Sequence, residues 1–364
     1  MQVCAVSVAY NNPRELARLL CSLETQSRLN GLIVLDNSRE AYLKENEAAF
    51  RMYAERYAFA KYIRSKVNRG SAGGFRLGMK IAHEQEFDWV WLLDQDGTVQ
   101  NGCLSSLLQN CDRGDILCPQ IVDIDDPSVV LAQSGAVQNF WGRIVWNAST
   151  VSQDISFFGT HGALISKKAL DVVGYYDQSN FFVGAEDLDY AFRTTSKHLA
   201  IRLVAEAQAR HRDARHKSAE KKDRLIDDGV IDSISAEGGA AGFKRFSYRG
   251  LTRLEPMTSG PFERILPEHL GYVSSKIVNN QNCRENQGLT SLSFAYLATK
   301  RLTTLQLATA CFYSVCTTLL RKVVSNGRIS LKETLTMYWV CLLSKIRKEW
   351  PFESVEQFCR RLCK

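Results

Sequence analysis

The sequence predicts an α/β fold, in which a mostly parallel β-sheet is flanked by helices and followed by a helical C-terminal region. Two observations support this class. In the first half of the chain, short apolar segments alternate with segments whose apolar residues recur at helical spacing. The chain also has 364 residues, of which 45% are hydrophobic and 23% charged, so it can bury a sizeable core.

The first four strands are predicted from apolar segments, two of which lead into an aspartate. They are Val3–Tyr10, Leu32–Leu35 with Asp36 at its end, Lys61–Lys66, and Trp89–Leu93 with Asp94 at its end.

Three helices are predicted between these strands. The first begins at Asn12-Pro13, because asparagine is a good N-cap and proline suits the first helical position. Its apolar residues then follow on one helix face: Leu16, Leu19, Leu20 and Leu23. The other two helices are expected over Arg39–Phe59 and Phe75–Glu86, the latter after a glycine-rich loop.

The pattern continues less regularly beyond residue 100. Strands are predicted over Asp115–Val122 and, with turns, over Val129–Trp146, and helices over Ser166–Val173 and Asp187–Lys197. Asp228–Gly242 is rich in Gly, Ala and Ser, which indicates a loop or hinge. We therefore expect one α/β domain over residues 1–225 and a helical, basic region over residues 226–364.

The C-terminal region carries most of the positive charge. From Ser291 to Lys364 there are twelve Lys or Arg and four Asp or Glu, which gives a net charge of +8. The whole chain has a net charge of +7, so residues 1–290 sum to −1. Leu302–Leu320 has no charged residue, but seven of its nineteen residues are Thr, Ser or Gln. This favours an in-plane amphipathic helix, or a helix packed on the main domain, over a membrane span. The expected partner of this region is an anionic membrane surface, since no nucleic-acid-binding motif accompanies the charge.

The eleven cysteines form no CxxC pair, so neither a zinc site nor a disulfide framework is expected. The N-terminus lacks the basic segment and long apolar stretch of a secretory signal. Both observations favour a reduced cytosolic compartment.

The segment Leu92–Gly97 is the strongest indication of chemistry. Asp94 and Asp96 leave the carboxyl end of a buried strand, where open α/β sheets bind their ligands. Hard carboxylate oxygens suit Mg²⁺ or Mn²⁺, which bridge the phosphates of nucleotides. A solvated turn is the alternative interpretation, because Asp and Gly also favour turns.

Two further segments have a functional and a structural interpretation. The loop Asn68–Phe75 is glycine-rich and precedes a helix, which suits an anion, but many such loops are only tight turns. Asp36 and Tyr10 end neighbouring strands and could hold a nucleobase, or Asp36 could cap a helix or turn.

The segment Asn180–Arg193 places acids at the start of a helix. Such acids commonly interact with the helix dipole, but one positioned carboxylate, Asp187, is also sufficient for a general base. Among the six histidines, His211 and His216 lie in a basic stretch, and His161 is either packed or substrate-facing.

Taken together, these motifs resemble the family 2 glycosyltransferases, which have the Rossmann-like GT-A fold. The resemblance covers about residues 2–215 and follows the order of the family's motifs: Val6–Asn11, Val34–Ser38, Asn68–Phe75, Asp94–Asp96, Gly159–Ser166 and Phe181–Arg193. Several weak motifs in the correct order are more specific than any one of them.

The resemblance implies a role for individual residues. The residues that bind the donor would be Tyr10 and Asp36 at the base, Asn68, Gly70 and Gly74 near the ribose and diphosphate, and Asp94 with Gln95 at the diphosphate. The metal ligands would be Asp94, Asp96 and His211, with His216 as a competitor, and the catalytic base would be Asp187. The sugar and acceptor pocket would include His161, Gly162 and Glu186, the last in place of the family's more usual Asp.

The implied function is that of a metal-dependent, inverting sugar transferase at the inner face of a bacterial cell membrane. The metal would be Mn²⁺ or Mg²⁺, the donor a UDP- or dTDP-linked sugar, and the acceptor a glycan or a polyprenyl-diphosphate-linked glycan. Asn68–Phe75 and Phe182–Arg193 are similar to bacterial galactofuranosyltransferases, whereas Asp94-Gln95-Asp96 is similar to bacterial rhamnosyltransferases. Two other classes stay open: a sugar nucleotidyltransferase, and a non-catalytic carbohydrate- or membrane-binding protein on a transferase fold.

Overall fold

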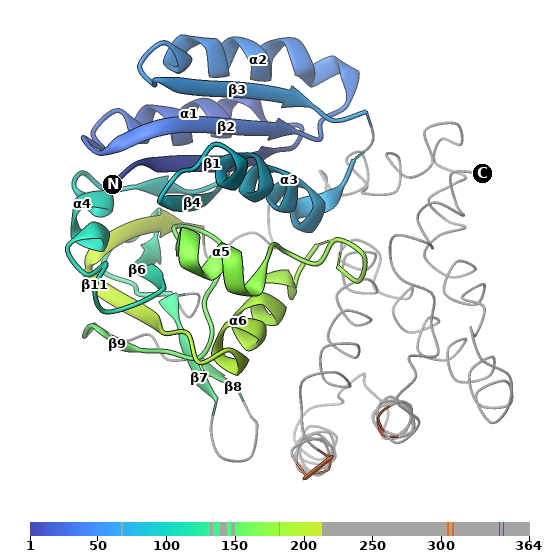
Figure 1. Cartoon of the computed structure of the whole chain (residues 1–364). Helices are drawn as coiled ribbons and strands as arrows, with labels where there is room; N and C mark the ends of the chain where they lie inside the picture. Colours follow the sequence, from blue (N-terminus) through green and yellow to red (C-terminus); the bar gives the residue numbers. More distant parts are fainter. Residues whose placement is uncertain are drawn as a thin grey trace, which may run out of the picture. The chain divides into compact units, whose positions relative to one another are not determined.

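The computed structural model describes residues 1–66, 68–131, 134–138, 144–146, 150–181 and 183–212, and the single residues 304, 305, 308, 342 and 345. The chain divides into two compact units, of which the first comprises Met1–Val137, Val145–Gln178 and Glu186–Lys221. This first unit contains the α/β fold (Figure 1).

The large sheet is mostly parallel, as the sequence predicts. Its strand order is β3-β2-β1-β4-β10-β6-β11-β5, with β9 paired to β11. The strands that run in parallel are β1 (Val3–Ala9), β2 (Leu29–Asp36), β3 (Phe59–Arg64), β4 (Trp89–Asp94), β6 (Ile116–Asp123) and β11 (Ile201–His211). Between β4 and β6 lies the short strand β10 (Leu164–Ser166), which is antiparallel to both and thereby gives them one direction. Two shorter strands, β5 (Thr98–Val99) and β9 (Gln153–Asp154), run antiparallel to β11.

Because six strands share one direction, their carboxyl ends meet at one edge of the sheet. The register places Ala9 beside Asp36, Val8 beside Asp94, and Asp123 beside His211. Residues from very different parts of the sequence are therefore brought to this edge, where ligand sites of open α/β sheets lie.

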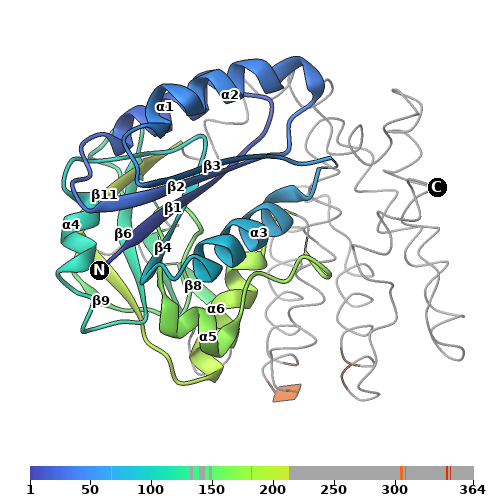
Figure 2. The same cartoon turned by 45° about the horizontal axis from the view of Figure 1, so that its top comes forward.

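Helices cover both faces of the sheet (Figure 2). On one face α1 (Pro13–Leu23) lies beside α2 (Glu40–Ala54), and α4 (Cys103–Leu108) extends the same apolar cluster. The opposite face carries α3 (Gly70–Glu84), with α5 (Lys167–Val173) and α6 (Glu186–Ser196) further along the sheet. A separate two-stranded sheet is formed by β7 (Ala136–Gln138) and β8 (Ile144–Trp146).

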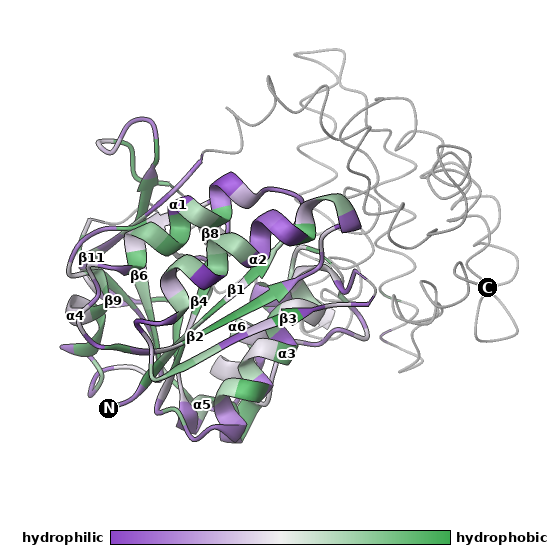
Figure 3. Ribbon diagram, turned by 90° about the horizontal axis from the view of Figure 1, so that it is seen from above, coloured by the Kyte–Doolittle hydropathy of each residue, from purple (hydrophilic) through white to green (hydrophobic). Residues whose placement is uncertain are grey.

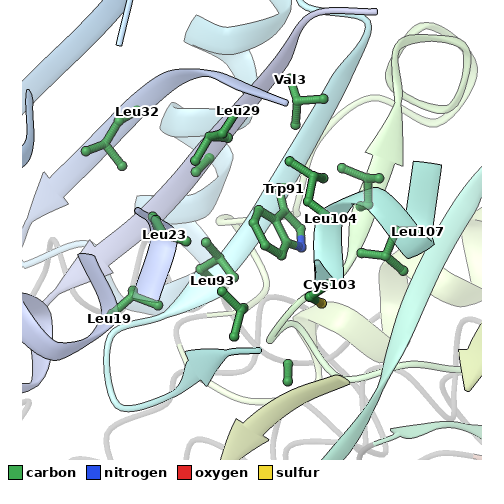
Figure 4. Packing of buried hydrophobic residues seen from close by; sticks show 14 of the residues in the cluster. Val3, Leu19, Leu23, Leu29, Leu32, Trp91, Leu93, Cys103, Leu104 and Leu107 are labelled. Atoms are coloured by element: carbon green, nitrogen blue, oxygen red, sulfur yellow. The ribbon is translucent and has the colours of Figure 1, made fainter. Parts of the chain in front are cut away.

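The core is built around Trp91 of β4, which is fully buried (Figure 4). Its ring lies between leucines of α1 and the residues Cys103, Leu104 and Leu107 of α4. The indole N–H donates to the Gly162 carbonyl at 2.9 Å, so the polar atom of this large side chain is also satisfied.

Hydropathy follows the layers (Figure 3): the central strands β1, β2 and β4 are mostly apolar, and polar residues lie on the outer faces of α1 and α2. The N-cap predicted for the first helix is confirmed, because the Asn12 side chain accepts a hydrogen bond from the Glu15 N–H. Within the described part of the chain, no helix has the length and apolarity needed to cross a membrane.

The structure corrects two predicted elements and contains a long strand that was missed. The Arg39–Phe59 helix ends at Ala54, and Phe59 already begins β3. The glycine-rich segment is not a loop, because α3 begins at Gly70 rather than Phe75. Strand β11 was not predicted at all, since Ala, Glu, Gln and Arg obscure its alternating pattern. The hinge at Asp228–Gly242 and His216 lie outside the described residues, as do nearly all residues of the predicted C-terminal helices.

Candidate active site at the carboxyl edge of the sheet

The three residues predicted to bind a metal meet at this edge. Asp94 ends β4, Asp96 lies in the turn that follows, and His211 ends β11. One ligand atom from each residue lies within 4.8 Å of the other two. Nε2 of His211 is 3.0 Å from Oδ1 of Asp96 and 3.8 Å from Oδ2 of Asp94.

The hydrogen bond on the far side of His211 determines which ring nitrogen faces the carboxylates. Nδ1 lies 3.1 Å from the Arg212 carbonyl oxygen, which can only accept, so Nδ1 carries a proton. In the neutral ring, Nε2 then directs its lone pair toward two carboxylates. That contact is favourable only with a proton or a cation between the groups, and metal-ligating histidines are commonly held by a backbone carbonyl in this way.

This donor set fits a divalent cation. Two carboxylate oxygens suit Mg²⁺ or Mn²⁺, and the imidazole nitrogen shifts the preference toward a transition ion such as Mn²⁺. Three protein ligands also leave coordination positions for water or for phosphate oxygens.

The loop before β10 contributes His161, whose ring lies against the Asp94–Gly97 turn. The Asp94 N–H donates to Nδ1 at 3.1 Å, and Nε2 donates to the Thr98 carbonyl oxygen at 3.2 Å. Both ring nitrogens are thus bonded to backbone, and the side chain is 5% exposed. This placement favours the packed interpretation of His161 over the substrate-facing one.

Gln95 connects the metal turn to the end of β1. Its amide oxygen accepts from the Tyr10 N–H at 2.8 Å, and its amide nitrogen donates to the Tyr10 carbonyl oxygen at 2.8 Å. The side chain therefore holds the backbone of a residue predicted to contact the base, and its own predicted contact with the donor stays a prediction.

Asp36 is fully buried at the end of β2. Its carboxylate accepts hydrogen bonds from the Ser38 N–H at 2.8 Å, from Asn46 Nδ2 at 2.9 Å and from the Tyr62 hydroxyl. Burial and this bond to Asp36 raise the pKa of the Tyr62 hydroxyl, which stays protonated. A nucleobase would have to replace one of these donors, so the predicted contact with the base stays a prediction.

The start of α3 is tied to β2 through Asn37. Its side chain donates to the Gly70 carbonyl oxygen at 3.0 Å and accepts from the Arg69 N–H at 3.3 Å. Asn68 accepts from the Gly70 N–H at 2.8 Å, and Gly70 has a left-handed φ of 65°. Asn68 and Gly70 therefore lie at the beginning of a helix close to the sheet edge, in a position suited to an anion.

Two other predicted glycines have a packing role in the structure. A Cβ on Gly74 would lie 2.7 Å from Val8, so this glycine lets α3 approach β1. Gly162 has a φ of +83°, and its N–H donates to the Leu92 carbonyl oxygen at 2.8 Å. Close packing and conformation explain both residues, and their predicted contacts with diphosphate and sugar stay predictions.

Asp187 lies in the first turn of α6 and is close enough to interact with Asp94. Its carboxylate accepts hydrogen bonds from the backbone N–H groups of Leu188, at 2.8 Å, and Thr160. Burial, together with the negative charge of Asp94, raises the pKa of Asp187 to about 6. The predicted base is therefore mostly ionised at neutral pH, and its pKa is close enough to that pH for effective proton transfer.

Glu186, next to Asp187, is 4% exposed. The Ser71 hydroxyl of α3 donates to its Oε1, and its Oε2 is buried without a hydrogen-bond partner among the residues that the structure describes. Burial and the negative charge of Asp187 raise the pKa of Glu186 to about 8. Near neutral pH the side chain is thus largely a neutral acid.

Sequence reasoning did not single out Ser71, Thr160 or Asn37. Each acts through a contact between residues more than 25 positions apart, and none belongs to a local pattern that reports such a contact. By contrast, Asp189 of the same acidic segment is structural, because it is fully buried and paired with Arg193 at 2.7 Å.

Comparisons with known proteins agree with this architecture. Residues 4–174 match the sequence model of the family described as glycosyl transferase family 2. Galactofuranosyltransferase GlfT1 of Mycobacterium tuberculosis is 38% identical over 130 residues, which cover 35% of this chain and 41% of that protein. The protein of the same name from Mycolicibacterium smegmatis is 31% identical over 199 residues, covering 50% of this chain and 62% of that protein.

The aligned part of the chain thus spans between 41% and 62% of the length of these relatives. Among solved structures, the crystal structure of GalNAc-T7 with UDP, GalNAc and Mn²⁺ has a TM-score of 0.49 and 11% identity, covering 83% of this chain and 58% of that one. That likeness is too distant to inform the site. The α/β domain of this chain thus matches family 2 glycosyltransferases over residues 4–174.

Proposed function

We propose that the chain is a metal-dependent, inverting glycosyltransferase. It moves galactofuranose or rhamnose from a UDP- or dTDP-linked donor to a glycan or polyprenyl-diphosphate-linked acceptor, in bacterial surface polysaccharide synthesis. The observation that carries the proposal is the convergence of Asp94, Asp96 and His211 within 4.8 Å, with Asp187 close enough to interact with Asp94. The name of the mycobacterial relatives favours galactofuranose.

The donor diphosphate would lie at the sheet edge. Asp94, Asp96 and His211 would hold Mn²⁺ or Mg²⁺, which neutralises the charge that develops on the departing diphosphate. The first turn of α3, with Asn68 and Gly70, adds backbone N–H groups and the positive end of a helix dipole on the same side.

The acceptor would react from the opposite face of the sugar. Asp187 takes the proton of the acceptor hydroxyl while that oxygen forms a bond to the anomeric carbon. The bond between that carbon and the diphosphate oxygen breaks in the same step, so the configuration inverts. Glu186 would bond a hydroxyl of the donor sugar or of the acceptor; its Oε2, which has no hydrogen-bond partner among the described residues, supports this role.

The remainder of the chain would bring the enzyme to its acceptor. We assign residues 1–225 to the catalytic domain and residues 226–364 to acceptor or membrane association, with the enzyme peripheral at the cytoplasmic face. Each Lys or Arg near an anionic leaflet contributes about 1 kcal/mol of binding free energy, so part of the +8 charge beyond Ser291 is sufficient.

The test has two stages. Thermal shifts with UDP-galactofuranose and dTDP-rhamnose, each with Mn²⁺, identify the donor, because a ligand of the folded state raises its stability. Transfer to a lipid-linked acceptor is then measured for the wild type and for Asp187→Asn. The variant should lose transfer by a factor of 10² or more, in the range of about 10²–10⁴ for a general base, and should bind the donor as the wild type does.

Three results would contradict the proposal. Near wild-type transfer by Asp187→Asn would show that Asp187 is not the general base. Transfer that persists after the metal has been removed completely would show that the reaction does not depend on a metal. If the protein makes the nucleotide-sugar from a sugar phosphate and a nucleoside triphosphate, or binds it without transfer to any acceptor, the chain belongs to one of the other two classes.

A further inference from the structure

The ring of His161 connects both ends of the turn that carries the two metal-binding aspartates. It accepts from the Asp94 N–H at 3.1 Å and donates to the Thr98 carbonyl oxygen at 3.2 Å. A carbonyl oxygen only accepts and an amide N–H only donates, so these partners require the neutral ring with its proton on Nε2. One rigid side chain thus fixes the separation of Asp94 and Thr98, between which Asp96 and Gly97 lie.

The fit between the ring and the turn leaves no room for a side chain at Gly97. A Cβ added there would overlap Cε1 and Nε2 of the His161 ring and would lie 2.7 Å from its Nδ1. Gly97 does not have a positive φ, so an alanine is compatible with its backbone conformation. The contact with His161 is therefore what excludes alanine at this position.

His161 is held rigidly and also lies beside the third metal ligand. The centroid of its ring is 5.5 Å from that of His211. The next residue, Gly162, is fixed to β4 through its N–H, which donates to the Leu92 carbonyl oxygen, and through its carbonyl oxygen, which accepts from Trp91. The ring is thus fixed relative to the buried sheet, and it contacts Asp94, Gly97 and His211.

We propose that His161 is a positioning residue of the metal site, which holds the Asp94–Gly97 turn in the geometry that places both aspartates beside His211. The inference rests on the proposed function insofar as the three residues bind a divalent cation. It assigns His161 no contact with the sugar, the acceptor or the metal.

The test measures Mn²⁺ affinity of the full-length protein by calorimetry and by the EPR signal of free Mn²⁺. Replacing partners that orient metal ligands typically lowers affinity about 10–100-fold, so His161→Ala should weaken binding at least tenfold. His161→Asn should recover part of the loss, because its amide oxygen lies near the former position of Nδ1 and accepts from the Asp94 N–H.

His83→Ala is the matched control. Both ring nitrogens of His83 are also engaged, with the Tyr175 hydroxyl at 2.9 Å and with Asp171 at 2.8 Å, but on α3, away from the metal-binding turn. Its Mn²⁺ affinity should equal that of the wild type. Equal losses in the two alanine variants would show a general effect on folding and would overturn the proposal.

A double-mutant cycle tests the same contact from the side of the turn. Gly97→Ala should weaken Mn²⁺ binding in the wild-type background and have little further effect in the His161→Ala background, where the ring is gone. Additive losses would overturn the proposal. Failure of the wild type to bind Mn²⁺ at all would instead reject the metal site of the proposed function, so the two failures are distinguishable.

Discussion

At the scale of single residues, the acidic segment at the start of α6 separates three carboxylates by environment. Asp189 is paired with Arg193, Asp187 is bonded to backbone N–H groups, and Glu186 is buried against Ser71. The sequence shows three equivalent acids in one helical turn. Only the contacts distinguish a structural ion pair, a proton acceptor and a neutral acid.

The environment of Glu186 predicts a pH-dependent stability. The pKa of Glu186 is about 8 in the folded protein, against an ordinary value of 4.5. Between these pH values the side chain is ionised in the unfolded protein and protonated in the folded one. The folded state therefore loses stability as the pH rises from 4.5 to 8. Glu186→Gln removes this cost and should be more stable than the wild type at pH 8, by at most about 5 kcal/mol for a shift of about 3.5 pKa units at about 1.4 kcal/mol per unit.

Chemical denaturation at pH 5 and pH 8 measures this difference, which should grow with pH. The exposed Glu55→Gln provides the control and should show no such trend. A constant difference across the pH range would mean that Glu186 is ionised in the folded protein throughout.

The raised pKa of Asp187 predicts the acid limb of the pH–rate profile. A general base acts in its ionised form, so transfer should rise with pH through a midpoint at or below about 6. The cation lowers this midpoint, because it balances the charge of Asp94 that raises the pKa of Asp187. Single-turnover rates between pH 4.5 and 8 check this, and a rate that falls across this range contradicts the assignment.

Site residues could be predicted from the sequence where an apolar strand and the residue at its end were recognisable. Asp94 and Asp96 followed from their place after a buried apolar strand. His211 followed only from the resemblance, because the strand that delivers it was not predicted. Gln95 and His161 bond backbone groups 63–85 residues away, and no local pattern reports such contacts.

At the scale of elements, the glycine-rich segment shows how one pattern has two physical explanations. The sequence left an anion-binding loop and a tight turn open, whereas the structure contains the first turns of a helix packed closely on β1. Gly74 faces Val8, and Gly78 one turn later faces Val6. Helical spacing of these two glycines, four residues apart, was the signal for a packing face.

Gly74→Ala should therefore destabilise the fold although alanine is the better helix former. Its Cβ would lie 2.7 Å from Val8, and overpacking costs about 1–3 kcal/mol, against about 1 kcal/mol gained in helix propensity. The free energy of unfolding should fall by up to about 2 kcal/mol, measured by chemical denaturation. In the Val8→Ala background the same change should be neutral or stabilising; an equal loss in both backgrounds would contradict this packing explanation.

At the scale of the whole molecule, composition and alternation predicted the α/β class and the mostly parallel sheet. The strand order was not predictable, because β10 and β11 enter the sheet from residues beyond 160 and short or weakly alternating strands carry little signal. The predicted boundary near residue 225 and the helical C-terminal region stay predictions.

The charge distribution predicts how the protein associates with membranes. Residues 291–364 carry a net +8, whereas residues 1–290 sum to −1. The full chain should cosediment with vesicles that contain anionic lipid, and not with neutral ones, and removal of residues 291–364 should abolish this binding. Binding should also weaken as salt is raised from about 0.05 to 0.5 M, because the Debye length shortens. Unchanged cosedimentation after the deletion would contradict the proposed role of this region.

The central claim is that one cation is held jointly by the ends of β4 and β11. Anomalous diffraction at the manganese edge, from crystals grown with Mn²⁺ and the donor nucleotide, tests it directly. The account predicts a single strong peak within coordination distance of Asp94, Asp96 and Nε2 of His211. A peak at another site, or one ligated by His216 in place of His211, would contradict it.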